Sequence, residues 1–194
     1  MKGKLSRMIG IIHKIKDNLP LSALKTIYLS LIQSSLHYGL IFWYNVSSDL
    51  RNKIINLQKK SIRLITGSTA LAHSEPLFKK SKILKFDDLY KLESCKFIHH
   101  ELLLGNNFNI FRHSDIHNYP TRSSNNLVPL YSRTNLGKNF ILSKGLNLYN
   151  SLPTSYKQLD SVPSFKCVFK LDLLESYSEN EFNIVLLFRL YNTR

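Results

Sequence analysis

Acidic residues, cysteines and long apolar runs are all scarce in this chain. Its 194 residues include 13 Asp and Glu against 27 Lys and Arg, a formal net charge of +14. Two cysteines, Cys95 and Cys167, are too few for a disulfide framework or a zinc ribbon, so we expect both thiols to be reduced and structural. No apolar run is long enough to span a bilayer, and charges are spread from Met1 to Leu19, unlike a secretion signal. We therefore expect an intracellular protein, in the cytoplasm or the nucleus, with no membrane partner.

Motifs for common catalytic sites are missing as well. The seven glycines are scattered, so no glycine-rich phosphate loop is formed. Neither a Gly-x-Ser-x-Gly turn nor a Cys-His signature marks a nucleophile. We therefore expect no cofactor and no catalysis by this chain on its own.

Positive charge is abundant, and most of it lies in the first third of the chain. Residues 1–67 hold eleven Lys and Arg against two Asp, a net charge of +9 out of +14. Lys and Arg on helices neutralise phosphates and release counterions, so a polyanion such as RNA or DNA is the expected partner. An anionic membrane surface is less favoured, because the apolar faces of these helices are needed for a core.

Apolar periodicity predicts a largely buried helix that begins near Leu24. Residues that lie on one face of a helix recur three or four positions apart. This spacing is found for Ile27, Tyr28, Leu31, Ile32, Tyr38, Gly39 and Phe42. Residues 36–41 make the other side apolar too. We expect Tyr38, Trp43 and Tyr44 to pack in a core rather than to stack on bases, since large aromatics dominate core energetics.

A second, amphipathic helix is predicted between Ser48, a residue type favoured at N-caps, and Gly67, which suits a left-handed C-terminal cap. Its inner side holds Leu50, Ile54, Leu57, Ser61, Leu64 and Ile65. Its outer side holds Lys53, Lys59, Lys60 and Arg63. Cationic helix faces are usually just solvated, but almost nothing acidic interrupts this one.

The rest of the chain predicts further helices, a polar loop and a small hairpin. Helices are expected at 76–83, at 86–104, at 146–152 and after Pro163, with Ser164 as the last cap. Residues 127–131 and 139–142 have the composition of two paired strands. The predicted fold is therefore mainly α, a helical bundle with a small β-hairpin in the second half.

This pattern divides the chain into four parts. A basic helical region covers residues 1–104, and a polar loop covers 105–126. The hairpin and short helices that pack on the bundle cover 127–175. The tail at 176–194 is left open between an added strand, an amphipathic helix and read-through.

The order of these segments resembles the region after the polymerase core in reverse transcriptases of LINE-type (non-LTR) retrotransposons, especially jockey-like elements. The first similar blocks are KLSRMIGIIHKIKDNLP at 4–20, LKTIYLSLIQSSLHYG at 24–39, LQKKSIRLITGS at 57–68 and AHSEPLFKKSKILKFDDLYKL at 72–92. Later blocks are HNYPTRSSNNL at 117–127, RTNLGKNFILSKGLNLYNSLP at 133–153 and SFKCVFKLDLL at 164–174.

The resemblance implies a non-catalytic piece of an RNA-directed DNA polymerase. Such enzymes hold two Mg²⁺ ions with carboxylates, which family members place upstream in a Phe/Tyr-x-Asp-Asp turn. The similarity begins after that point, so we expect Met1 to be an internal methionine of a longer frame and the chain to be a fragment, a truncated copy or a partial gene model. The implied partners are template RNA or target DNA, bound without sequence preference, and the upstream polymerase core.

Nine cations are the candidate contacts to nucleic-acid phosphates. They are Lys4, Arg7, Lys14, Lys53, Lys59, Lys60 and Arg63, with Arg122 and Arg133 in the loop and hairpin. Two alternative functions are kept. One is a structural or protein-interaction remnant whose apolar helices once packed on the polymerase core. The other is an independent metal-dependent enzyme.

Two metal sites are weighed against simpler interpretations. Phe86-Asp87-Asp88 resembles the polymerase motif but lacks its intervening residue, and helix-start charges explain the two aspartates better. Cys95 and His99 could form a four-ligand zinc set with His113 and His117, against helix packing and solvated loop histidines. We predict no metal site.

Overall fold

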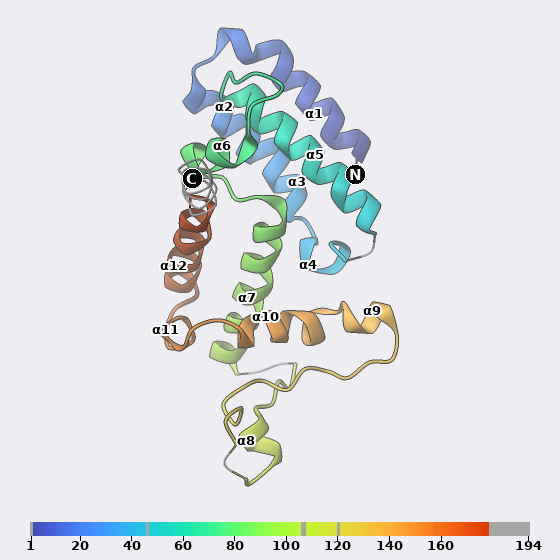
Figure 1. The fold of residues 1–194 in the computed structure, drawn as a ribbon, viewed down its shortest axis with the longest axis vertical. Coiled ribbons are helices and arrows are strands. Elements are labelled where there is room, and N and C mark those ends of the chain that lie inside the picture. The colour runs from blue at the N-terminus through green and yellow to red at the C-terminus, as the bar shows by residue number, and fades with distance from the viewer. Residues whose placement is uncertain (1, 46, 106–107, 120, 179–194) are drawn as a thin grey trace, which may run out of the picture. The chain divides into compact units, whose positions relative to one another are not determined.

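The computed structural model describes residues 2–45, 47–105, 108–119 and 121–178, and these are mainly helical (Figure 1). The chain forms two compact units. Unit 1 comprises Met1–Tyr38, Asp49–Asp88 and Lys170–Arg194, and unit 2 comprises Gly39–Ser48 and Leu89–Phe169. Helices α7 and α12 contribute residues to both units.

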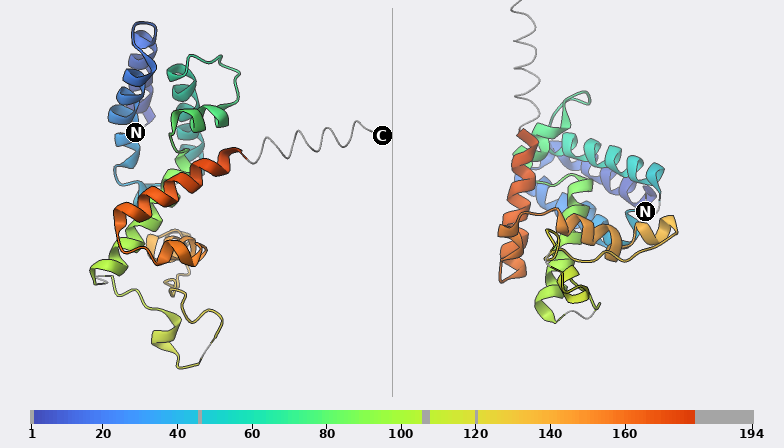
Figure 2. Two further views of the ribbon diagram at one scale, coloured as in Figure 1. Left: turned by 90° about the vertical axis from the view of Figure 1, so that its left-hand side faces the viewer. Right: turned by 60° about the horizontal axis from the view of Figure 1, so that its bottom comes forward.

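Unit 1 is a helical bundle, as the sequence predicts. Its elements are α1 (Lys2–Ile15), η1 (Lys16–Asn18), α2 (Leu21–Ile27), η2 (Tyr28–Gln33), α3 (Ser34–His37), α5 (Ser48–Ile65) and α6 (Ser74–Ser81). Helix α1, the row from α2 to α3, and α5 lie side by side (Figures 1 and 2). Their shared core includes Leu5 and Ile9 of α1, Ile32 and Leu36 of the second row, and Ile54 of α5.

The continuous helical segment formed by α2, η2 and α3 keeps one buried face because η2, in its middle, is a π-helix rather than an α-helix. Leu24, Tyr28, Ile32 and Leu36 are all buried, at steps of exactly four residues. In an α-helix such steps drift by about 40° each, because four residues exceed one turn of 3.6. The π-helical segment η2 offsets this drift, since its turns hold more residues.

The predicted continuous helix ends earlier than expected, at His37, and a turn at Tyr38 and Gly39 follows. The φ of Gly39, +62°, lies in the left-handed region, and the chain starts again as α4 (Leu40–Trp43). The expected burial of Tyr38 is wrong, because the side chain beside this break is 86 % exposed. Trp43 is half-buried, and Tyr44 is buried as expected.

Helix α5 has the predicted C-terminal cap, but Ser48 is its first helical residue rather than the residue before it. Gly67 has a φ of +65°. The N–H of Ser68 donates to the carbonyl of Arg63 at 3.0 Å, and the N–H of Gly67 donates to that of Leu64 at 3.4 Å. These two bonds form a Schellman motif, which satisfies carbonyls at the end of the helix.

Unit 2 packs around the long helix α7 (Phe86–Leu104), whose bounds match the prediction. Its shorter elements are α4, α8 (His113–Ile116), α9 (Asn135–Lys138), η3 (Ile141–Gly145), α10 (Leu146–Asn150) and α11 (Thr154–Lys157), with α12 (Val162–Glu175) near the end. The rings of Tyr44 and Tyr90 stack with centroids 3.8 Å apart. His99 stacks on Phe165 with centroids 4.4 Å apart.

The predicted hairpin is wrong. Residues 135–138 and 141–145 are helical, and the residues that the structure describes contain no β-strand. A single backbone bond, from the N–H of Leu130 to the carbonyl of Leu142 at 2.8 Å, joins the two expected strands. Ile141 of the second expected strand is instead buried in the helical segment η3, and Leu146 is buried at the start of α10.

The polar loop and the last cap also differ in detail from the prediction. Within 105–126 the chain forms the single-turn helix α8 and one isolated bridge between Arg112 and Leu127. The last helix starts at Val162, and its cap is Ser161 rather than Ser164. The Ser161 hydroxyl accepts from the N–H of Ser164 at 3.2 Å.

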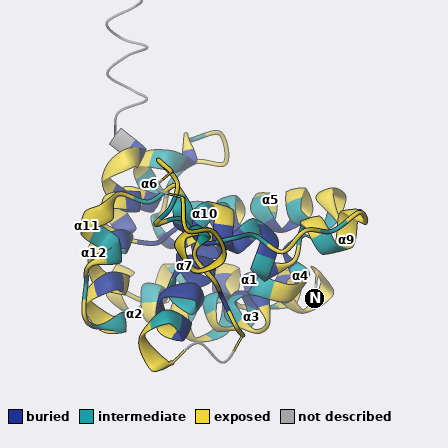
Figure 3. Ribbon diagram, turned by 90° about the horizontal axis from the view of Figure 1, so that it is seen from below, coloured by how far each residue is buried: buried dark blue, intermediate teal, exposed yellow. Residues whose placement is uncertain are grey.

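Burial follows the amphipathic pattern in the helices of both units. Figure 3 shows buried and exposed residues alternating along the helical ribbons. Of the helices that the structure describes, none has the length and hydropathy needed to cross a membrane. Most of the tail, residues 179–194, lies outside the described residues, and so do the alternatives predicted for its structure there.

Candidate nucleic-acid interface

Three of the predicted phosphate contacts form an exposed row on α1. Lys4, Arg7 and Lys14 are exposed, and the buried residues of α1 lie on its opposite side. At about 100° per residue the three cations fall within about 80° of one another. Helix α1 contains no Asp or Glu. No ion pair to these three cations is found among the residues that the structure describes.

The cations of α5 occupy the two flanks of its outer face. Lys53 and Lys60 lie on one flank, and Lys59 and Arg63 lie on the other, about 60 to 120° away around the helix. Lys60 borders a small cavity of about 130 Å³ that it shares with His13 of α1. The α1 cations Lys4, Arg7 and Lys14 are not part of this lining, so contact between α1 and α5 here is made by Ser6, Ile9, Gly10 and His13.

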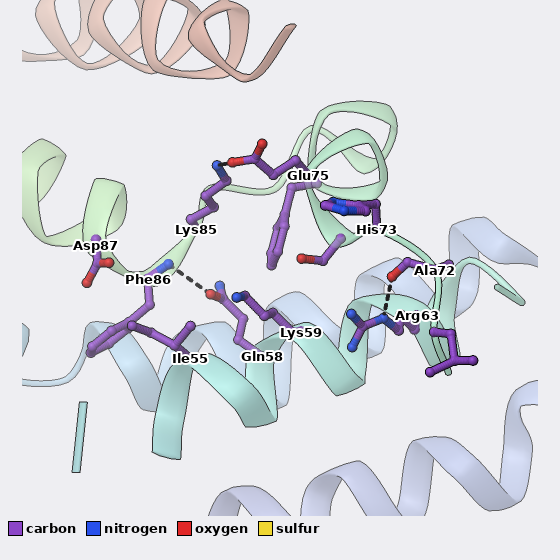
Figure 4. A pocket seen from close by; sticks show the side chains of 13 residues that line it. Ile55, Gln58, Lys59, Arg63, Ala72, His73, Glu75, Lys85, Phe86 and Asp87 are labelled. Atoms are coloured by element: carbon purple, nitrogen blue, oxygen red, sulfur yellow. Dashed lines mark hydrogen bonds and ion pairs between the residues drawn. The ribbon is translucent and has the colours of Figure 1, made fainter. Parts of the chain in front are cut away.

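The other flank of α5 opens onto a pocket of about 430 Å³ (Figure 4). Lys59 and Arg63 line it from α5, and His73 and Lys85 line it from the segments before α6 and α7. Figure 4 shows the Arg63 side chain directed from α5 toward Ala72, and the Lys59 side chain beside Gln58. Sequence reasoning found the two α5 cations but missed Lys85, because the pocket joins residues more than twenty positions apart.

Two local contacts decide which charges in this pocket remain open to a ligand. The Arg63 Nε donates to the carbonyl of Ala72 at 2.8 Å, which fixes the guanidinium of this pocket-lining residue. The Lys85 ammonium pairs with the Glu75 carboxylate and lies 4.2 Å from the centre of the Tyr177 ring. Lys59 and Arg63 therefore carry the positive charge that is not paired with a carboxylate among the described residues.

A buried glutamine fixes the floor of the pocket. Gln58 is 3 % exposed, and its Nε2 donates to the Tyr28 hydroxyl at 3.1 Å and to the Leu84 carbonyl at 2.9 Å. Its Oε1 accepts from the Phe86 N–H at 2.8 Å. The residue thus holds α5 in register with the start of α7. Helical spacing predicts inner positions for Ile54 and Ser61, which are buried, but not for Gln58.

The aspartate pair at the start of α7 has a structural role. Asp88 is buried, and its Oδ2 accepts from the Tyr177 hydroxyl at 2.8 Å. Burial, and then the charge of Asp88, raise the pKa of Tyr177, so this phenol remains a hydrogen-bond donor at neutral pH. Asp87 lines the pocket. Within the described parts of the chain, no three His, Cys, Asp or Glu side chains gather in a way that could hold a metal ion.

The four residues of the zinc alternative are dispersed. Cys95 and His99 are buried in unit 2, and the His99 Nδ1 lies 3.0 Å from the Tyr149 hydroxyl. Burial lowers the pKa of His99 and raises the pKa of Cys95 to about 12. His113 begins α8, and His117 follows it in an exposed position. The buried pair is explained by packing.

The last two predicted contacts belong to unit 2. Arg122 is exposed and lines a different cavity, and Arg133 is exposed in the segment before α9. Seven of the nine predicted cations are thus in unit 1, on α1 and α5. These seven are the candidate phosphate contacts of unit 1.

Comparison with known proteins adds no relative: no protein-family model, no curated protein and no solved structure matches this chain. The similarity to retrotransposon reverse transcriptases stays a prediction based on the sequence blocks.

Proposed function

We propose that unit 1 binds the phosphate backbone of RNA or DNA without sequence preference. The observation that carries this proposal is the exposed cationic row of α1 together with the outer face of α5. Both are formed by helices almost devoid of acidic residues. Phosphate contacts of this kind give affinity and position but do not read sequence. Cations on regular helices fit a repeating anionic backbone better than a single small ligand.

The same proposal gives the chain a place in a larger system. It is the non-catalytic, post-polymerase part of a LINE-type reverse transcriptase, which acts inside the cell and helps to hold template RNA or target DNA beside the polymerase core. The sequence blocks support this origin, and the concentration of charge in unit 1 supports the binding role. The chain itself would then perform no chemistry.

Binding to labelled oligonucleotides tests this function. Fluorescence anisotropy with RNA and DNA of mixed sequence should give similar affinities for unrelated sequences of equal length. The variant Lys4→Gln/Arg7→Gln/Lys14→Gln should bind more weakly than the wild-type protein. A matched control, Lys79→Gln/Lys138→Gln/Lys166→Gln, removes three exposed cations elsewhere and should bind more strongly than the α1 variant. No binding by the wild-type protein, or strong preference for one sequence, would reject the proposal.

A protein-interaction role is the second candidate, and a patch in unit 2 favours it. A cavity of about 360 Å³ is lined almost entirely by apolar side chains, among them Phe111, Ile116 and Leu130, each about half-exposed. Tyr131, also in its lining, is 85 % exposed. Apolar patches of this kind often mark protein contacts. Association that increases with protein concentration, is weakened by Phe111→Ser and occurs without nucleic-acid affinity would favour this role.

A further inference from the structure

Unit 2 contains a second cationic cavity that the proposed backbone contact does not use. Its volume is about 560 Å³. The end of α7, the segment around 122–127, and helices α10 and α11 form its walls. Three cations line it, namely Arg112, Arg122 and Lys157, and the lining described contains no Asp or Glu. A cavity whose described walls carry positive charge without a carboxylate is suited to an anion.

The walls of the cavity are held by hydrogen bonds rather than by loose loop contacts. The Leu127 N–H donates to the Asn150 Oδ1 at 2.9 Å, and the Asn150 Nδ2 donates back to the Leu127 carbonyl at 2.8 Å. The N–H of His113 donates to the carbonyl of Asn126 at 3.0 Å, and the backbones of Arg112 and Leu127 form an isolated antiparallel β-bridge. The segments that carry Arg112 and Arg122 are therefore tied to each other and to α10.

Lys157 is the most constrained of the three cations. Its Nζ donates to the carbonyl of Asn150 at 2.8 Å and lies 5.9 Å from the centre of the Tyr149 ring. Burial, and then the charge of Arg112, lower the pKa of Lys157. The two like charges thus repel each other across the cavity wall, and a bound anion would relieve this repulsion.

The chemistry of the remaining walls limits the kind of anion. The amides of Asn125 and Gln158 and the hydroxyl of Thr154 are further polar groups in the lining. Leu102 and Leu103 provide an apolar wall for a non-polar part of a ligand. The volume falls within the range of roughly 300 to 1,000 Å³ typical of small-molecule sites, and it exceeds what a bare phosphate fills.

We propose that this cavity binds the phosphate of a phosphomonoester, with Arg112, Arg122 and Lys157 as its cationic ligands. A phosphomonoester carries between about −1.5 and −2 charges at neutral pH and offers three acceptor oxygens to this set of donors. Each internal phosphate of a nucleic acid carries only one charge, and the backbone favours a row of cations over several cations in one cavity. The monoester can belong to a free nucleotide or to the 5′-phosphate at the end of a strand.

Calorimetric titration with adenosine monophosphate, adenosine and inorganic phosphate tests the site. The wild-type protein should bind the monophosphate at least tenfold more tightly than adenosine. Arg112→Gln and Lys157→Gln should each weaken this binding at least tenfold, whereas Arg133→Gln, an exposed residue of the same unit, should not. Arg122→Gln is a further test on an exposed residue, where folding is least affected. Oligonucleotides with and without a 5′-phosphate then distinguish a strand end from a free nucleotide.

Two results would overturn the proposal. One is the absence of monophosphate and inorganic-phosphate binding at millimolar concentration. The other is equal binding by the wild-type protein and by the Arg112→Gln, Arg122→Gln and Lys157→Gln variants. The α1 triple variant separates this site from the proposed backbone contact, because it should lose nucleic-acid affinity and keep monophosphate binding.

Discussion

The side-chain oxygen of Gln58 accepts a hydrogen bond from the backbone N–H of Phe86 at 2.8 Å, deep within unit 1. This bond joins the middle of α5 to the first residue of α7. Because the same α5 carries Lys59 beside Gln58, the buried bond also determines where this cation lies in the pocket.

Replacing Gln58 with leucine should destabilise unit 1 by about 2 to 4 kcal/mol. The substitution removes the three buried hydrogen bonds of Gln58, to the Tyr28 hydroxyl, the Leu84 carbonyl and the Phe86 N–H. Chemical denaturation of the two proteins measures the difference. Asn56→Leu, on the exposed side of the same helix, is the control and should change the free energy of unfolding by less than about 0.5 kcal/mol. A Gln58→Leu protein as stable as the control would show that the bonds contribute little.

The two cysteines should react very differently with a thiol reagent. Cys167 is exposed, whereas Cys95 is buried and its pKa is raised to about 12, so its reactive thiolate is scarce at neutral pH. Titration of the native protein with a disulfide reagent at pH 8 should modify one thiol, and the second only after unfolding. In the Cys167→Ser variant the fast reaction should disappear. Two fast thiols in the native wild-type protein would contradict the packing of α7.

Cys95 should also make unfolding sensitive to alkaline pH. The folded state holds the thiol proton more tightly than the unfolded chain, whose reference pKa is 9.0. The corresponding stabilisation is complete below pH 9 and is lost progressively as the pH rises toward 12. The free energy of unfolding is measured against pH over this range for the wild-type protein and for Cys95→Ala. The contribution of Cys95 is the difference between the two slopes. Equal slopes for the two proteins would exclude this contribution of Cys95.

His99 should have the opposite effect on the acid side. Burial lowers its pKa, so the unfolded chain binds a proton at a higher pH than the folded protein does. Stability from this group is present above about pH 6.5 and is lost as the pH falls toward the depressed value. Denaturation between pH 7.5 and 4.5 should show a weaker pH dependence for His99→Gln than for the wild-type protein. Identical pH profiles for His99→Gln and the wild-type protein would contradict this contribution of His99.

The pocket beside α5 gives a separate prediction for nucleic-acid binding. Lys59 and Arg63 line it together, so Lys59→Gln/Arg63→Gln should reduce the slope of log K against log salt by about 1 to 2 for a duplex. Lys79→Gln/Lys80→Gln removes two exposed cations of α6 and should change the slope less. If the Lys79→Gln/Lys80→Gln variant has the larger effect on the slope, Lys59 and Arg63 do not contact the nucleic-acid phosphates.

Long amphipathic helices were predictable because a single periodicity decides them. The bounds of α7 agree with the prediction, and Gly67 caps α5 through the left-handed conformation that glycine favours. Tyr38 was misplaced because the apolar pattern continues past Gly39, where the backbone turns away. Local sequence therefore predicted which segments are helical better than it predicted where they change direction.

The candidate site was predictable only where one helix supplies it. The cations of α1 and α5 follow from helical spacing, and the structure keeps them exposed or at a pocket wall. Gln58 could have been suspected, because it lies four residues from both Ile54 and Ile62, which are buried. Lys85 reaches the pocket through a tertiary arrangement that no local pattern encodes. The hairpin prediction is wrong for a different reason, since a short apolar run suits a strand and a helical turn equally well.

The salt dependence of nucleic-acid affinity tests the central claim most directly. Dissociation constants for a duplex between about 50 and 200 mM salt should rise steeply for the wild-type protein. For Lys4→Gln/Arg7→Gln/Lys14→Gln the slope should be shallower by roughly 2 to 3, while the matched triple variant at Lys79, Lys138 and Lys166 should stay close to the wild-type slope. A wild-type affinity that does not change over this range, or equal losses in the two triple variants, would contradict a phosphate-binding face on α1 and α5.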